Sequence, residues 1–456
     1  MKKVLNVDNK AFGLSSAIFL GIGSMVGAGI FIVIGEAGAI AGTLVTLSFI
    51  LGGIIALLCG YSLGKLAVRY PSRGGIIEYL VQGYGEGLFS GTLGVLFYFA
   101  QLIALAAVAK SFGTYAATYI SSGDTALYTD IFSLGILLMF VIINLVGAST
   151  VARSESIIVI IKLAMLGLFT GSALIFIHPA NFSLSNIPGP MTTLYALGLT
   201  FFAYQGFSVI TNSVEDMKDP GRTMMRSMVW AILIVGALYL LVTIAVFGNL
   251  PLAEVIKDRD FALAKAAEPA FGTWGFKVMA GTALLATASA INATLYAVTQ
   301  IGYTLAKEGD LPEIYEMHVF HNTEGLIVSA LLIVPMILLL NLGQIAATAA
   351  VAVLLIQGFT HIGHLRRLSQ TRANATLIIM AVLGTFGAAF FAVFHIAESD
   401  PWFPVYIAAA FLAAFLLEVL LRTLTHRTIG RKIVQDLEKV ASEIDKEIEH
   451  IIRPND

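Results

Sequence analysis

The sequence predicts an all-α, polytopic membrane protein with about twelve transmembrane helices. Hydrophobic residues make up 57% of the 456 residues and charged residues only 12%, about half of the roughly 25% that is usual in soluble globular domains. The mean hydropathy of +0.86 agrees with a lipid bilayer as the surroundings of most of the chain. Apolar runs long enough to cross a hydrocarbon layer of about 30 Å recur from one end of the sequence to the other.

These apolar runs place the expected helices. The first run is too long for the apolar part of a signal peptide and another run follows it directly, so we interpret it as a retained membrane span. The expected spans are residues 11–35, 41–66, 84–119, 126–148, 155–177, 190–214, 226–249, 271–306, 325–341, 343–363, 374–396 and 402–422.

Lysine and arginine gather in every second connection between the expected spans. Arg366, Arg367 and Arg372 follow the tenth span, for example, whereas most of the alternate connections have no basic residue. The longer segment 250–270 is the exception, because it carries both basic and acidic residues. Short basic connections stay in the cytoplasm. We therefore expect a multi-pass protein of the cell membrane with both termini, including residues 1–10, on the cytoplasmic side.

The composition changes after the last span. In residues 426–456, apolar side chains recur at three- and four-residue spacing among Asp, Glu and Lys. This pattern predicts an amphipathic helix of the soluble kind. It is consistent with a passive tail and also with a segment that docks on the cytoplasmic face or on a partner subunit.

Two strings of residues interrupt apolar spans. In the first span, GIGSMVGAGIF (residues 21–31) places four glycines where each costs about 1 kcal/mol of helix stability relative to alanine. Gly23 and Gly27 fit a close helix-packing pattern, but they also fit a break whose free backbone ends face a site at mid-membrane. FFAYQGF (residues 201–207) interrupts the sixth span in a similar way, and this favours the break. Because five spans separate the two strings, the second half of the chain would be inverted.

A pair of such breaks suits a zwitterion. Free amides at the start of a half-helix attract a carboxylate, and those of the first break belong to Gly27, Ala28 and Gly29. Carbonyls at the other half-helix ends attract an ammonium group, and these belong to Met25, Phe202, Ala203 and Gln205. Phe202 and Tyr204 could gate the pocket, although packing in the core or against lipid also explains aromatic residues here.

Few other side chains within the spans carry chemistry. Lys162, inside the fifth span, is a functional candidate because a membrane-embedded lysine is costly, although it lies close enough to the span end to snorkel. For Lys110 we favour a structural role. The eighth span has a polar seam, whose members either bond their own helix or line a site: Thr287, Ser289 and Asn292. His361, His364 and His395 lie near span ends and are expected at the interface.

Several function classes lack support in the sequence. No metal-ligand cluster, phosphate-binding loop or nucleophile motif is present, which argues against an enzyme and against ATP-driven transport. The single cysteine, Cys59, provides neither a disulfide framework nor a thiolate metal site. The net charge of −2 does not suggest a nucleic-acid partner. The expected partners are an amino acid and the lipid bilayer, and the oligomeric state is left open.

Three motifs resemble the amino acid–polyamine–organocation transporter superfamily. They are GIGSMVGAGIF in the first span, YPSRGGIIEYLVQGYG after the second, and FFAYQGFSVITNSVEDMKDPGRTMMRSM around the sixth. Within that superfamily, the ApcT type is resembled by GNLPLAEVIK, NATLYAVTQIGYTLAKEGDLPE and, above all, the lysine-containing IIKLAMLGLF. This resemblance implies a LeuT-like fold with inverted repeats over residues 11–177 and 190–364, followed by two further helices in residues 374–424.

The resemblance also implies roles for particular residues. The Lys162 amine would take the place of a sodium ion, against the Gly23 carbonyl and the Ser289 hydroxyl, so that a proton is the coupling ion and no other cofactor is needed. The substrate carboxylate would meet the Ala28 and Gly29 amides. Relatives often have Ser or Thr where this chain has Ala28, which offers no hydroxyl.

The resulting hypothesis is an amino acid importer that works by proton symport and alternating access. The alternatives are a proton-independent exchanger, in which Lys162 is a fixed charge, and an amino acid sensor that uses the same pocket without transport. Accumulation of substrate against its gradient separates these possibilities, because a sensor cannot produce it.

Overall fold

The computed structural model describes residues 13–72, 74–120, 124–146, 151–182, 189–315, 317–319 and 322–425. The expected N-terminal segment 1–10 and the expected C-terminal helix 426–456 lie outside the described residues. The α-helices are α1 (Leu14–Met25), α2 (Ala28–Ala41), α3 (Val45–Arg69), α4 (Ile76–Tyr84), α5 (Leu88–Ala117), α6 (Thr125–Val146), α7 (Val151–Ala173), α8 (Met191–Tyr195), α9 (Leu197–Tyr204), α10 (Pro220–Asn249), α11 (Leu252–Lys257), α12 (Ala262–Lys265), α13 (Glu268–Glu308), α14 (Glu324–Leu339), α15 (Leu342–Leu365), α16 (Leu368–Thr371), α17 (Ala375–Ser399) and α18 (Phe403–Thr425).

Short elements complete the described chain. The 3₁₀ helices are η1 (Gly42–Leu44), η2 (Leu174–Phe176), η3 (Pro179–Phe182), η5 (Gln205–Asp216), η6 (Arg259–Phe261) and η7 (Glu313–Tyr315). Two short antiparallel strands, β1 (His318–Val319) and β2 (Asn322–Thr323), precede α14. The protein is thus almost entirely helical in its described part, as the sequence predicts.

Nine helical stretches among the described residues are long and apolar enough to cross a membrane, and two shorter apolar helices accompany them. The nine are Gly29–Arg69, Leu88–Ala117, Thr125–Val146, Ile157–Phe176, Pro220–Asn249, Glu268–Lys307, Leu342–Leu365, Ala375–Ser399 and Phe403–Thr423. Large apolar side chains are exposed on the outer sides of the long and the shorter apolar helices, such as Trp274 and Leu339, which are 74% and 79% exposed. Exposed apolar surface of this extent fits contact with lipid.

Local sequence signals set several helix ends. Asn341 caps α15, because its side chain accepts the Gln344 N–H at 2.9 Å while the Gln344 side chain accepts the Asn341 N–H. Pro220 begins α10, where its missing N–H costs nothing. Gly309 ends α13 in the left-handed conformation, with φ of 88°. Gly272, with φ of 63°, kinks α13 near its start.

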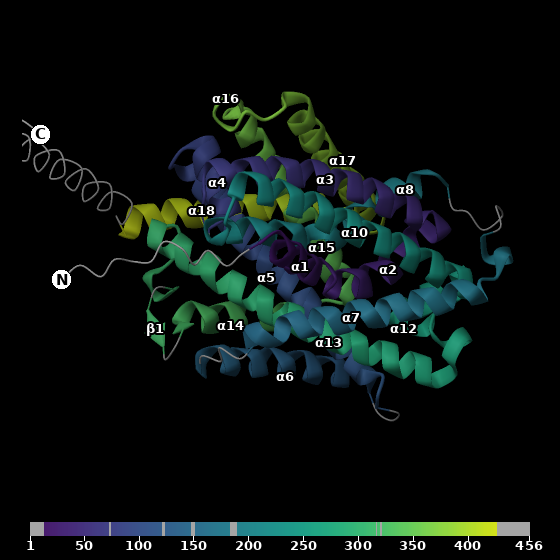
Figure 1. Ribbon diagram of the computed structural model, residues 1–456. Coiled ribbons are helices and arrows are strands. Elements are labelled where there is room, and N and C mark those ends of the chain that lie inside the picture. Colours follow the sequence, from purple (N-terminus) through teal and green to yellow (C-terminus); the bar gives the residue numbers. More distant parts are fainter. Residues whose placement is uncertain are drawn as a thin grey trace, which may run out of the picture.

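The long helices lie side by side along roughly one direction, with α1 and α2 in the middle of the bundle (Figure 1). α1 contacts α7, α10 and η5, and α2 contacts α9. The two interrupted spans therefore touch one another inside a shell of continuous helices.

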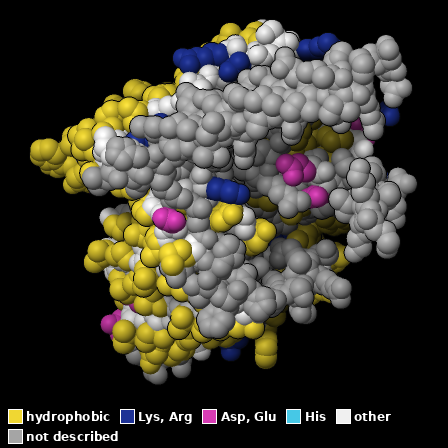
Figure 2. Space-filling view, turned by 90° about the vertical axis from the view of Figure 1, so that its left-hand side faces the viewer, with side chains coloured by type: hydrophobic (Ala, Val, Ile, Leu, Met, Phe, Trp, Pro, Cys, Tyr) yellow, Lys and Arg dark blue, Asp and Glu magenta, His cyan; other side chains and the backbone are white. Residues whose placement is uncertain are grey.

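One end of the bundle carries a group of basic residues, which we call the basic end: Lys65, Arg69, Arg366, Arg367 and Arg372. In the space-filling view from the left of Figure 1, Lys and Arg side chains form separate patches, and hydrophobic side chains gather along one side of the visible face (Figure 2). At the other end, the segment 250–270 folds into α11, η6 and α12. Its Arg259 pairs with the buried Glu36 of α2, with 3.7 Å between Nε and Oε1.

Candidate functional site

The first break lies where the glycine string predicts it. α1 ends at Met25, α2 begins at Ala28, and Gly27 between them has the non-helical angles φ −103° and ψ −121°. The Val26 N–H still donates to the Ile22 carbonyl at 2.8 Å. Helical hydrogen bonding therefore continues up to the residue before Gly27 and ends abruptly there. A break of this kind leaves the last carbonyls of α1 and the first amides of α2 without partners in their own helices.

The second break is a change of helix type. α9 ends at Tyr204, and the chain continues as the 3₁₀ helix η5, which is 12 residues long. Runs of 3₁₀ helix longer than three or four residues are uncommon, and inside a helix they often mark a functional hinge. The sequence predicts an interruption here, and the structure specifies its form: the helix tightens, and the backbone does not unwind.

The glycines also bring the two breaks into direct contact. A Cβ atom added at Gly29 would lie 2.8 Å from the Ala203 carbonyl oxygen, and one added at Gly206 would lie 2.4 Å from the Ser24 carbonyl carbon. Both distances are shorter than real contacts of a Cβ atom. The sequence favours a helix break over helix packing, and the structure uses glycine for both.

Tyr239 of α10 joins the ends of the two half-helices. Its hydroxyl lies 2.7 Å from the Met25 carbonyl oxygen and 3.1 Å from that of Ala203, and its side chain is fully buried. A phenol has one proton to donate, so these two carbonyls share it. The sequence does not predict this contact, since nothing distinguishes a tyrosine in an apolar run from a packing residue.

Lys162 of α7 is fully buried and does not snorkel. Its Nζ donates to the Gly23 carbonyl at 2.6 Å, in the last turn of α1. Ser289 of α13 is also buried, at 5% exposure, and α13 packs against α7. The lysine thus contacts the main chain of the broken helix only two residues before that helix ends.

The residues expected around the substrate lie in the core at the two breaks. Met25, Phe202 and Ala203 are 1%, 8% and 2% exposed. Tyr204 donates its hydroxyl to the Phe49 carbonyl at 3.1 Å, so it is held against α3. The Gln205 side chain is half-buried.

Gln205 has a partner on α15 that the sequence analysis missed. The Nε2 atom of the fully buried Gln357 donates to its Oε1 at 2.9 Å. The second break is therefore tied to α15 by a side-chain contact, in addition to its backbone contact with α1.

Other polar candidates have structural partners. Lys110 forms an ion pair with Asp130 at 2.6 Å and also donates to the Ile337 carbonyl at 2.7 Å, so it ties α5 to α6 and α14. Thr287 donates to the Ala283 carbonyl of its own helix at 2.7 Å. Asn292 accepts from Asn144 of α6 at 3.0 Å.

Two histidines were placed wrongly by the sequence analysis. His361 and His364 were expected at the interface, but both are fully buried, with their Nδ1 atoms 2.8 Å from the Ser62 hydroxyl oxygen. Distance from a span end does not reveal burial, because α3 and α16 cover this part of α15. His395 is half-exposed and stacks on Tyr195, in agreement with the expected interfacial position.

The part of the chain that the structure describes has no group of three or more His, Cys, Asp or Glu side chains that could hold a metal ion. Cys59 is buried. What the described core offers instead is main-chain donors and acceptors at two helix breaks, with a buried lysine beside the first.

The sequence is similar to known membrane transport proteins. A family model for amino acid permeases matches residues 12–416. An uncharacterized protein of Methanocaldococcus jannaschii is 32% identical over 94% of this chain and 99% of its own length. The inner membrane transport protein YbaT of Escherichia coli is 33% identical over 83% of this chain and 88% of its own length.

More distant similarity extends to named amino acid carriers. The serine/threonine exchanger SteT of Bacillus subtilis is 26% identical over 66% of this chain and 69% of its own length. The family model covers most of the chain, including both helix breaks. The chain therefore belongs to the amino acid permease family, and it is a multi-pass membrane transporter and not an enzyme.

Proposed function

We propose that this transporter imports amino acids by proton symport, with the buried amine of Lys162 in the place that a sodium ion would occupy. The observation that carries the proposal is the 2.6 Å contact between the Lys162 Nζ and the Gly23 carbonyl in the last turn of α1. Protonation of the amine adds one positive charge at the broken helix, and deprotonation removes it. The state of the lysine can thereby set the position of α1.

The substrate would bind across the two breaks. The first amides of α2, from Gly27, Ala28 and Gly29, suit a carboxylate, because a helix N-terminus carries unpaired N–H groups and partial positive charge. The carbonyls of Met25, Phe202, Ala203 and Gln205 suit an ammonium group. One zwitterion would thus bridge two half-helices, and its binding would favour the conformation in which both are correctly placed.

The position of Tyr239 supports this assignment. Its hydroxyl lies within hydrogen-bonding distance of both the Met25 and the Ala203 carbonyl oxygens. A substrate ammonium with three protons would complete the hydrogen bonding of these carbonyls. Tyr239 would then act as a positioning residue that keeps the acceptors together between substrate molecules.

The names of relatives point to the same substrate class. One is a serine/threonine exchanger and another is a branched-chain amino acid permease, both from Bacillus subtilis. We infer that this chain carries amino acids, and that it does so in the cell membrane. With the positive-inside rule, the basic end faces the cytoplasm.

An exchanger is the second candidate, because one relative bears that name. Uptake of labelled amino acids into sodium-free proteoliposomes distinguishes symport from exchange. Symport predicts accumulation above equilibrium with an inward proton gradient and none after the gradient is collapsed. Uptake that is independent of the proton gradient and requires amino acid inside the vesicles would establish exchange. Lys162 would then have no coupling role.

A further inference from the structure

A row of buried polar side chains begins one helical turn after Gln357, the partner of the second break, and runs to the basic end. We call it the histidine chain, and its members are Ser62, His361, His364 and Thr371. They come from α3, α15 and α16, and each is at most 7% exposed. Buried polar groups are costly unless they are hydrogen-bonded, and three of the bonds that satisfy them run from one member to the next.

The bonds of the histidine chain are short and continuous. The Ser62 hydroxyl oxygen lies 2.8 Å from the Nδ1 atom of each histidine. The Nε2 atom of His364 lies 2.9 Å from the Thr371 hydroxyl oxygen. From the first imidazole to the threonine, no link is longer than a normal hydrogen bond.

The chain starts next to the candidate substrate site. Gln357, which bonds Gln205 of η5, lies one helical turn before His361 on α15, so their side chains share a face of the helix. Within the described residues, the Gln357 Oε1 and the His361 Nε2 are both buried without a hydrogen-bond partner. Buried polar atoms of this kind are rare in folded proteins. They mark this end of the chain as a place that receives a further group.

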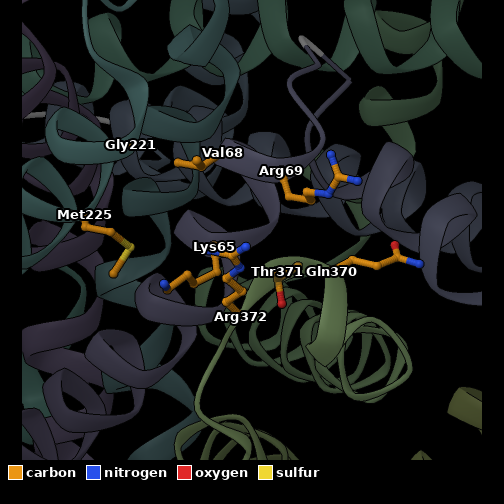
Figure 3. A pocket seen from close by; sticks show the side chains of 8 residues that line it. All are labelled: Lys65, Val68, Arg69, Gly221, Met225, Gln370, Thr371 and Arg372. Carbon is orange, nitrogen blue, oxygen red and sulfur yellow. The ribbon is translucent and has the colours of Figure 1, made fainter.

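The chain ends at a pocket open to the basic end. Thr371 lines this cavity of about 190 Å³ together with Lys65, Val68, Arg69, Gly221, Met225, Gln370 and Arg372. In the close-up, the Thr371 side chain lies between those of Lys65 and Gln370 (Figure 3). Water at this pocket is therefore within reach of the last hydroxyl of the chain.

The hydrogen-bond geometry allows only two proton arrangements. Ser62 has one proton, so it can donate to one histidine and must accept an N–H from the other. The Thr371 hydroxyl also lies 3.2 Å from the Arg367 carbonyl oxygen, to which it can donate. In that arrangement His364 donates from Nε2 to Thr371, Ser62 donates to His364, and His361 donates from Nδ1 to Ser62. The Nε2 atom of His361 then has a free lone pair.

We propose that the histidine chain conducts the coupling proton from the second helix break to the basic end. A proton binds the His361 Nε2, and the Nδ1 proton of the same ring passes to Ser62. Ser62 releases its own proton to the Nδ1 of His364, whose Nε2 proton passes to Thr371. The Thr371 proton leaves to water in the pocket. One proton enters, one leaves, and every hydrogen bond of the chain is reversed.

This inference rests on the proposed proton symport and adds the route by which the proton reaches the cytoplasm. The route does not require either histidine to hold a positive charge for long, since each ring gains one proton as it loses another. The fixed charges at its exit are the basic side chains of the pocket, such as Lys65.

The test compares Ser62→Ala with wild-type protein in proteoliposomes. Removal of the hydroxyl should slow accumulation driven by a proton gradient by about 100-fold, the low end of what a positioned proton-transfer group contributes. Counterflow of labelled amino acid into preloaded vesicles should be unchanged, because it needs no net proton movement. His361→Gln should give the same pattern. Ser48→Ala is the matched control, since Ser48 is a buried serine of α3 bonded to Thr200 and is outside the chain.

Three outcomes would overturn the proposal. If Ser62→Ala and His361→Gln accumulate substrate like wild-type protein, the relay is wrong while the symport proposal stands. If both variants lose counterflow together with accumulation, the histidine chain is a structural network. If wild-type protein shows no dependence on the gradient, the symport proposal itself fails, and the relay fails with it.

Discussion

Lys162 is the side chain whose position is most difficult to explain by packing. Removal of an ammonium group from water costs several kcal/mol unless partners compensate, and this lysine is fully buried. Its Nζ contacts a main-chain carbonyl of α1, close to the end of that helix. Lys110 offers a contrast within the same protein, because its ion pair with Asp130 is partly exposed and joins continuous helices.

We expect Lys162→Ala to abolish proton-driven accumulation while the protein still folds and carries out counterflow. The substitution removes the only proposed proton site beside the first break. Lys110→Ala is the matched control and should lower the thermal midpoint without loss of coupling, since it breaks a structural ion pair. Uptake in proteoliposomes and melting in detergent measure the two effects. Accumulation by Lys162→Ala on a pH gradient would show that the assigned role is wrong.

At the scale of secondary structure, the two helix breaks present backbone N–H and C=O groups to the candidate site. α1 has 12 residues and few polar side chains, so its main chain must supply the donors and acceptors for a zwitterion. The break also depends on small residues. A Cβ atom at Gly27 would lie 2.9 Å from the Ala290 Cβ of α13.

Gly27→Leu should therefore weaken amino acid binding by at least about tenfold, equivalent to 1.4 kcal/mol, because its side chain fills the break. Gly29→Ala is a smaller change that should act in the same direction, against the Ala203 carbonyl. Gly171→Leu is the control, since nothing lies within 4 Å of a Cβ there. Equilibrium binding of labelled amino acid to the purified proteins is the measurement. Unchanged affinity in both glycine variants would remove the first break from the site.

Tyr239→Phe tests the link between the half-helices. Loss of the hydroxyl leaves two buried carbonyls without this donor, so the free energy of unfolding should fall by about 1–3 kcal/mol. Tyr128→Phe, at a tyrosine that stacks on Phe132, should change stability little. The thermal midpoints of the two variants give the comparison. Equal midpoints would mean that Tyr239 does not hold the breaks together.

The sequence predicted the helical elements better than their local form. Hydropathy and length located the spans, and glycine with polar residues located both breaks, since these properties are local. The β1–β2 pair is local, but two residues in each strand are too few to form a pattern. The 3₁₀ form of η5 and the short helix α4 depend on contacts with distant segments. For the same reason the burial of His361 and His364, and the roles of Tyr239 and Gln357 as partners of the breaks, had no signal in the sequence.

The whole molecule presents an apolar flank and a basic end. Such an asymmetry orients a membrane protein with its basic connections in the cytoplasm. At the opposite end, the ion pair of Arg259 with Glu36 joins the segment 250–270 to α2. Arg259 therefore has a structural use, which fits the departure of this segment from the charge alternation.

Cysteine labelling tests this orientation. Cys59 is buried and can be replaced by alanine to give a cysteine-free background. In that background, Arg372→Cys should react with a membrane-impermeant maleimide only in inside-out vesicles. Trp402, in the connection between α17 and α18, is 65% exposed, and Trp402→Cys should react in intact cells. The reverse pattern would place the basic end outside.

We expect amino acid and proton to cross together through a site made by the two broken helices and Lys162. The internal pH of sodium-free proteoliposomes that contain a pH-sensitive dye, followed after an amino acid is added outside, tests this expectation. Proton symport predicts acidification of the interior in step with uptake of labelled substrate, and no acidification with Lys162→Ala. Uptake by the wild-type protein at constant internal pH would contradict it.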